Sequence, residues 1–251
     1  SFILMIKISA ISYINTIPFI YGLKQSNIID DIDLELDYPS VCAKKLINFD
    51  VDIALVPVAI IPKLSKYSII SDFCIGANGS VDTVCLYSQV PIYDVKSIAL
   101  DYQSVTSVSL LKILLNQYWN LTPVLLNTTS GFEGEIDGTH AALVIGDRAF
   151  KLNEKYAYSY DLSLIWKEMT GLPFVFAVWV SNTKLSYDFI NSFNKALKTG
   201  LMNIEKSIYK EIHNYPSCES PENYLNHKIS YELDSAKKDG MELFLKKLAA
   251  L

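Results

Sequence analysis

The amino-terminal part of the chain alternates short apolar strands with helices, and this alternation restricts the fold more than any other feature. Residues 6–11 predict a strand, and Pro18 suits the first turn of a following helix. A strand over 33–36, a helix over 39–46 and a buried strand over 51–56 come next. Because such strands are joined by right-handed crossovers, the pattern predicts a parallel sheet covered by helices.

A second strand-to-helix unit spans residues 97–115. Its strand ends at Leu100, and apolar residues recur at helical spacing from Val108 onward. Between them stand Ser104, Thr106 and Ser107. Hydroxyl groups at a helix start cap backbone N–H groups, and the same N–H groups can hold an anion. Because open α/β sheets bind ligands at the carboxyl ends of their strands, we predict a small-anion site at Ser104–Ser107, with plain capping as the alternative.

Polar residues also follow other predicted strands. A buried strand ending near residue 145 leads into Gly146 and Asp147, so Asp147 is a further candidate, with a turn aspartate as the alternative. Asn15 and Thr16 lie at the turn after the first strand. Gly79 precedes Ser80 in a loop where glycine either lets the backbone approach a ligand or simply bends the chain.

The order of the elements predicts two lobes. Two blocks rich in strands and helices, about 5–88 and 95–175, precede helices expected over 187–198, 202–212, 221–227 and 234–249. We expect the chain to cross between the lobes near residues 87–95 and 173–181. This layout is typical of an α/β, two-lobed periplasmic-binding-protein type II-like fold, with a ligand cleft between the lobes. Lobe 1 is expected to comprise residues 1–88 and 180–251, and lobe 2 residues 89–179.

Charge and hydropathy exclude several classes of partner. The 251 residues carry a net charge of −5 without a basic run, which argues against nucleic acid as a partner. No apolar run approaches the roughly 18 residues that span a bilayer, so no membrane partner is expected. Arg148 is the only arginine, and it either faces the ligand or pairs with nearby acids. An acidic ligand is therefore expected to be held mainly by lysines, hydroxyls and backbone N–H groups.

The four cysteines and three histidines show no metal-ligand spacing. Without H-E-x-x-H or G-x-S-x-G, metal-dependent hydrolysis and serine-hydrolase chemistry are poorly supported, and we expect no metal. Three cysteines have apolar neighbours and are expected to be reduced core residues, as is typical of a cytoplasmic protein. Met5 is a candidate initiator, with residues 1–4 an added segment. The alternative is a chain from which a signal peptide has been removed.

Five motifs follow one another along the chain, and a tail at Tyr224–Leu225 and Ile229–Leu233 completes them. The motifs are Ile11–Pro18 (ISYINTIP), Gly79–Val81, Ser104 with Thr106–Val108, Ile145–Asp147 and Thr170–Ala177 (TGLPFVFA). In this order they resemble the blocks of the chorismate dehydratase family of menaquinone biosynthesis. Each motif alone is weak evidence for the family, but five motifs in the same order over almost the whole chain are specific evidence for it.

The resemblance implies a binding-protein fold that works as a lyase in the futalosine route to menaquinone. The family removes water from chorismate to give 3-[(1-carboxyvinyl)oxy]benzoate, without a metal or an organic cofactor. Its key asparagine corresponds to Asn15 and its glycine-flanked serine to Ser80, which we expect to be the catalytic residues. The expected substrate-binding residues are Tyr13, Thr16, Val81, Ser104, Thr106, Ser107, Asp147 and Phe176, with Leu100 and Trp179 as further wall residues.

The substrate chemistry suggests what the protein has to supply. Chorismate carries two carboxylates, and loss of a ring proton with the neighbouring hydroxyl forms an aromatic ring. The protein therefore mainly needs to position groups and stabilise developing charge. An amide is too weakly basic to take the proton, so we expect the enolpyruvyl carboxylate to take it, held by Asn15 and Ser80. Asp147 is the alternative base.

Two alternative functions remain open from the sequence. One is a solute-binding protein of the same fold that binds a small carboxylate without catalysis. The other is the related enzyme that forms 1,4-dihydroxy-6-naphthoate later in the pathway. The sequence leaves the oligomeric state undetermined.

Overall fold

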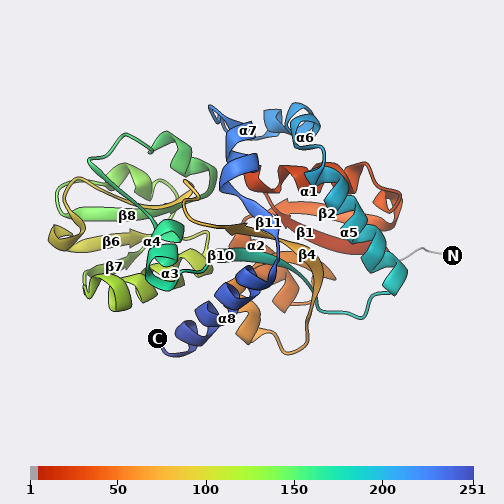
Figure 1. Cartoon of the computed structure of the whole chain (residues 1–251), viewed down its shortest axis with the longest axis horizontal. Helices are drawn as coiled ribbons and strands as arrows, with labels where there is room; N and C mark the ends of the chain where they lie inside the picture. The colour runs from red at the N-terminus through yellow and green to blue at the C-terminus, as the bar shows by residue number, and fades with distance from the viewer. Residues whose placement is uncertain (1–4) are drawn as a thin grey trace. The chain divides into compact units, whose positions relative to one another are not determined.

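The computed structural model describes residues 5–251 and divides the chain into two compact units. Unit 1 comprises the chain up to Gly76 together with Val175–Asp234, and unit 2 comprises Ala77–Phe174 together with Ser235–Leu251. Each unit has one mixed sheet with helices packed against it, and Figure 1 labels most of these strands and helices. The expectation for residues 1–4 lies outside the described residues.

Unit 1 is built on a six-stranded sheet in the order β11-β4-β10-β3-β1-β2. The predicted parallel alternation over residues 6–57 is confirmed, because β1 pairs in parallel with both β2 and β3. β10 runs antiparallel to β3. The strands are β1 (Ile6–Ile11), β2 (Ile32–Asp37), β3 (Ile53–Pro57), β4 (Ser68–Ala77), β10 (Phe174–Ser181) and β11 (Ser230–Glu232). The helices are α1 (Ile17–Lys24), α2 (Pro39–Ile47), α5 (Tyr187–Leu201), α6 (Ile204–Glu211) and α7 (Pro221–Asn223).

Two features explain the core of unit 1. Every residue of β3 is buried, as expected for a strand in the middle of a sheet with both faces covered. Trp179 of β10 is also fully buried and lies edge-on to the rings of Phe19 and Phe193. Trp179 is therefore a core residue of this unit.

Unit 2 has a five-stranded sheet in the order β7-β6-β8-β5-β9. β6 runs parallel to β7 and β8, whereas β5 runs antiparallel to β8 and β9. The strands are β5 (Val84–Ser88), β6 (Ser97–Leu100), β7 (Val124–Asn127), β8 (His140–Ile145) and β9 (Tyr158–Asp161). The helices are α3 (Val105–Leu114), α4 (Leu162–Thr170) and α8 (Ser235–Ala249).

The boundaries of the units differ from those of the expected lobes. Residues 77–88 belong to unit 2, because β5 pairs with β8 and β9. The carboxyl-terminal helix α8 also belongs to unit 2, where Phe244 lies edge-on to Trp166 and Phe174. The chain therefore changes unit after residues 76, 174 and 234. The change after residue 174 falls in the expected crossing at 173–181.

Candidate functional site

The turn after β1 places Tyr13, Asn15 and Thr16 next to one another in unit 1. β1 ends at Ile11, and the chain passes through one 3₁₀ turn, Ile14–Thr16, directly into α1. Pro18 lies in the first turn of α1, where its missing N–H costs nothing. All three polar side chains are buried, Asn15 with 9% of its surface exposed and Thr16 with none.

Asn15 is held by two hydroxyl groups of unit 1. The Thr16 hydroxyl donates to the Asn15 carboxamide oxygen Oδ1 at 3.0 Å. The Tyr231 hydroxyl of β11 donates to the Asn15 backbone carbonyl at 2.6 Å. Thr16 has no exposed surface, and contact of its side chain with a ligand stays a prediction.

The loop before β5 carries Ser80 in unit 2. Gly79 has φ +111°, a conformation that side chains rarely adopt, so this position requires glycine. The Ser80 hydroxyl donates to the Asp82 carboxylate at 2.6 Å. Asp82 itself has φ +66°, which is uncommon for a residue other than glycine and costs free energy unless its surroundings hold it in place.

Asp161 holds this loop in place. Its Oδ2 accepts hydrogen bonds from the backbone N–H groups of Val81 and Asp82 at 2.8 and 2.7 Å. Its Oδ1 caps α4 by accepting from the N–H groups of Ser163 and Leu164, both at 3.1 Å. Burial raises the pKa of Asp161, and the N–H groups that it accepts from oppose the rise. Asp161 was not among the predicted site residues, although its place before a helical stretch is a recognisable N-cap signal.

The start of α3 shows helix capping, which was the alternative to an anion site. The Ser104 side chain accepts a hydrogen bond from the Ser107 N–H at 3.2 Å, and its hydroxyl lies 3.2 Å from the Ser107 hydroxyl. Ser104, Thr106 and Ser107 are all buried. The two serines are therefore hydrogen-bonded to each other at the helix start, and anion binding there stays a prediction.

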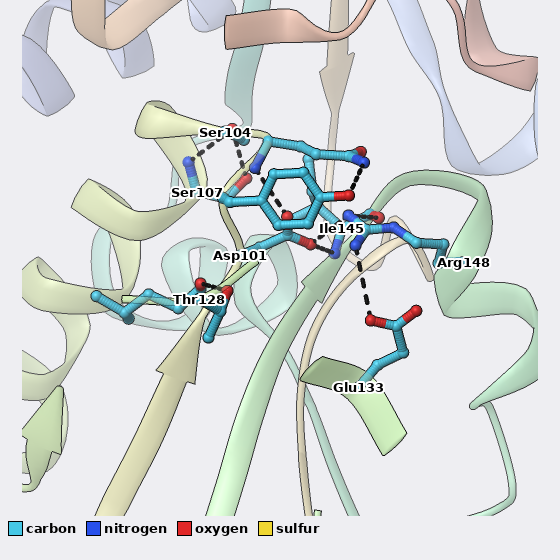
Figure 2. A network of polar contacts seen from close by, with 10 residues as sticks. Asp101, Ser104, Ser107, Thr128, Glu133, Ile145 and Arg148 are labelled. Atoms are coloured by element: carbon cyan, nitrogen blue, oxygen red, sulfur yellow. Dashed lines mark hydrogen bonds and ion pairs between the residues drawn. The ribbon is translucent and has the colours of Figure 1, made fainter. Parts of the chain in front are cut away.

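Asp101, which is buried, forms an ion pair with the partly buried Arg148 beside this helix start (Figure 2). Asp101 Oδ2 accepts from the Arg148 guanidinium at 2.6 Å and from the Ile145 N–H at 2.9 Å, while Oδ1 accepts from the Gln103 N–H at 2.9 Å. Glu133 lies 3.9 Å from the other side of the guanidinium. The structure thus shows Arg148 paired with nearby acids, which was one of the two roles expected for it. Asp101 thereby ties the ends of β6 and β8 together.

Two further predicted residues lie on different elements. Asp147 is buried in the 3₁₀ turn Gly146–Lys151 directly after β8, so its expected place at the carboxyl end of a strand is confirmed. Phe176 is the one residue of β10 that is only partly buried. Tyr13, Asn15, Thr16 and Phe176 lie in unit 1, and the other predicted site residues lie in unit 2.

A polar cavity of unit 2 was not predicted. It has a volume of about 400 Å³ and is lined by residues 127–132 and Glu135, in the loop that follows β7. Thr128 of this loop donates its hydroxyl to the Leu100 carbonyl at the end of β6. Within residues 5–251, no group of three or more His, Cys, Asp and Glu side chains is arranged to hold a metal ion. In the same range, no helix combines the length and apolar character needed to cross a membrane.

Comparison with solved structures shows the fold. A structural-genomics protein from Archaeoglobus fulgidus superposes with a TM-score of 0.77 at 14% identity, covering 98% of this chain and 97% of that one. A Candida albicans protein described as having the generic periplasmic binding protein fold gives 0.65 at 13% identity, covering 98% and 90%. The periplasmic aliphatic sulphonate binding protein of Escherichia coli gives 0.59 at 12% identity, covering 98% and 86%. The expected periplasmic-binding-protein fold class is thus confirmed.

Comparison of sequences shows the family. A chorismate dehydratase of Campylobacter jejuni is 28% identical over 251 residues, covering 96% of each protein. One from Thermus thermophilus is 32% identical over 128 residues, so the match spans only 44% of this chain and 46% of that relative. The profile of the family described as menaquinone biosynthesis matches residues 6–250. Because this match covers nearly the whole chain, the protein belongs to the menaquinone biosynthesis family.

Proposed function

We propose that the protein is a chorismate dehydratase, a hydro-lyase that converts chorismate to 3-[(1-carboxyvinyl)oxy]benzoate. The observation that carries the proposal is the near-complete match to the Campylobacter relative of that name, within a family of menaquinone biosynthesis. The local arrangement of Asn15 supports it, because a carboxamide held in the turn after a strand is suited to bind an anionic substrate.

The reaction is balanced without an oxidant or a reductant. The ring carbon that bears the enolpyruvyl ether loses a proton, and the neighbouring ring carbon loses its hydroxyl group. Proton and hydroxyl together form the released water, and the two electrons of the broken C–H bond complete the aromatic ring. We propose that the enolpyruvyl carboxylate of the substrate accepts the proton, since neither an amide nor a serine hydroxyl is basic enough at neutral pH.

Asn15 and Ser80 are the proposed catalytic residues. The N–H groups of the Asn15 carboxamide would donate to the substrate and stabilise its developing charge. Ser80 would provide a second polar contact, oriented by its hydrogen bond to Asp82. The proposed binding residues are Tyr13, Val81, Ser104, Thr106, Ser107, Asp147 and Phe176, with the carboxylates of chorismate expected to meet hydroxyl and backbone N–H groups.

The test is incubation of the purified protein with chorismate, with the products separated by chromatography. We expect rapid formation of 3-[(1-carboxyvinyl)oxy]benzoate, and a fall in turnover of about 10²–10³-fold in N15A and in S80A. Asn226 is a matched control, because its side chain is exposed and donates only to the Glu222 carbonyl, so N226A should keep full activity.

Other outcomes would point elsewhere. Chorismate that stays unchanged but raises the unfolding temperature would indicate a binding protein without catalysis. Neither reaction nor binding would mean that chorismate is not the substrate. Near-normal turnover in N15A or S80A would show that the catalytic residues have been assigned incorrectly.

A further inference from the structure

The two hydroxyl groups that hold Asn15 belong to buried residues. Thr16 is fully buried, and its hydroxyl donates to Asn15 Oδ1. Tyr231 is buried too, and its ring lies edge-on to Phe19 with 5.2 Å between the ring centres. Burial raises the pKa of Tyr231 well above its usual value, so its hydroxyl keeps its proton and remains a donor to the Asn15 carbonyl.

The contact from Thr16 determines which end of the carboxamide faces outward. An asparagine side chain has an acceptor oxygen on one side and a donor nitrogen on the other. The hydrogen bonds of Asn15 use its Oδ1 and its backbone carbonyl. The two N–H groups of Nδ2 are therefore the part of the side chain left to meet a ligand.

We propose that Thr16 is a positioning residue that makes Asn15 a hydrogen-bond donor to an anionic atom of the substrate, while Tyr231 holds the backbone at Asn15. This inference rests on the proposed function only in so far as Asn15 contacts the substrate. Thr16 itself does not touch the substrate, which changes the role that the sequence suggested for it.

An aspartate at position 15 distinguishes this orientation from the opposite one. In N15D, one carboxylate oxygen can still accept from Thr16, but the other replaces the N–H groups with a negatively charged acceptor. If Asn15 donates to an anion, repulsion should make N15D at least as inactive as N15A. If Asn15 instead offered its oxygen to a substrate donor, N15D would retain much more activity than N15A, and that result would overturn the proposal.

The positioning role of Thr16 predicts a separation of kcat from KM. T16V has the same shape but lacks the hydroxyl, and we expect kcat to fall about 10–100-fold with KM changed by less than about twofold, because misplacement of a catalytic group mainly affects the transition state. T16S restores the hydroxyl and should recover most of kcat. Y231F should lower kcat less than T16V does, since it releases only the backbone. Thr199 is the matched control, because its exposed hydroxyl donates only to the Lys195 carbonyl, so T199V should behave as the wild type.

A measurement independent of turnover separates this inference from the proposed function. The side-chain NH₂ signal of Asn15 in a ¹⁵N-labelled protein can be assigned by its absence in N15A and N15D. We expect it to shift in T16V and to stay near its wild-type position in T16S, with thermal unfolding used to verify that each variant is folded. An unchanged NH₂ signal in T16V would refute the positioning role. If the wild type shows no turnover while the Asn15 NH₂ signal still shifts in T16V, the dehydratase proposal is refuted. The positioning role of Thr16 then still holds.

Discussion

Replacing Asp161 with alanine removes a single carboxylate that accepts four backbone hydrogen bonds. Two come from the loop that carries Ser80, at Val81 and Asp82, and two from the first turn of α4. The variant should therefore loosen the loop and uncap the helix at the same time. This makes Asp161 the residue of unit 2 whose loss we expect to affect both stability and the candidate site.

The magnitude follows from the burial of each donor. Loss of an N-cap costs about 1 kcal/mol. The Val81 N–H belongs to a buried residue, and leaving such a group without an acceptor costs about 1–3 kcal/mol. Asp82 is only half-buried, so water can partly replace its acceptor. Because burying a carboxylate is itself unfavourable, removing it offsets part of this loss of stability. We expect the free energy of unfolding to fall by about 2–4 kcal/mol, and the midpoint temperature by roughly 5–15 °C.

The assay is thermal unfolding followed by circular dichroism, combined with hydrogen exchange at the amides of Val81 and Asp82. D161N is the informative second variant. Asparagine caps helices as well as aspartate does, but it has one acceptor oxygen, so it can serve the loop or the helix and not both. D161N should therefore lose about half of what D161A loses. Asp137 is the control, because its exposed side chain accepts from a single N–H, that of Gly138.

Two results would refute this reasoning. The first is a D161A variant that is no less stable than D137A, which would mean that the four hydrogen bonds contribute no net stability. The second is a D161N variant as stable as the wild type with slow exchange at both loop amides, which would mean that the loop does not depend on the carboxylate.

Two other predictions concern unit 2. Burial raises the pKa of Asp101 while the Arg148 guanidinium opposes the rise, so R148M should raise this pKa further. An acid with a raised pKa favours the folded state at low pH and loses that contribution as the pH rises through the raised pKa. The stability lost in R148M should therefore be small at acidic pH, where Asp101 is protonated in both states, and grow as the pH rises through the raised pKa, as measured by urea unfolding. In a D101N background, this pH dependence of the R148M effect should disappear; if it persists, Asp101 is not its source. A Cβ at Gly240 of α8 would lie 2.2 Å from the Pro173 carbonyl, so G240A should lower the unfolding midpoint although alanine favours helix formation. Gly134, where a Cβ meets nothing within 4 Å, is the control, and equal stability of G240A and G134A would contradict the close approach.

Local patterns predicted most of the secondary structure correctly. The strands at 6–11 and 97–100 and the helix begun by Pro18 were found at or near their expected bounds. The strand β9 and the strand β11 were missed, because they are short and rich in polar residues. Glycine is unfavourable in the interior of a helix, and the structure supplies the reason for Gly240 in the close approach to the Pro173 carbonyl.

The candidate site was likewise predicted only in part from the sequence. Asn15 and Ser104 were predicted as site residues from their places after strands, and Ser80 from its glycine-containing loop and a family resemblance. Ser104 caps a helix, as local chemistry allows. The partners of these residues were not identified. Asp161 supports the Ser80 loop from 79–80 residues away, and Arg148 binds Asp101 across 47 residues.

The sequence by itself determined the alternation of strands and helices, the polar residues at the strand ends and the family to which the chain belongs. Only the tertiary structure decided which buried groups hold those residues in place, as in the bond from Tyr231 to Asn15, which are 216 positions apart. The physical reason is the distance along the chain over which each kind of interaction acts. Periodicity and capping depend on neighbours within about one helical turn, whereas a buried polar contact forms only where the packed sheet removes both partners from water and brings them together.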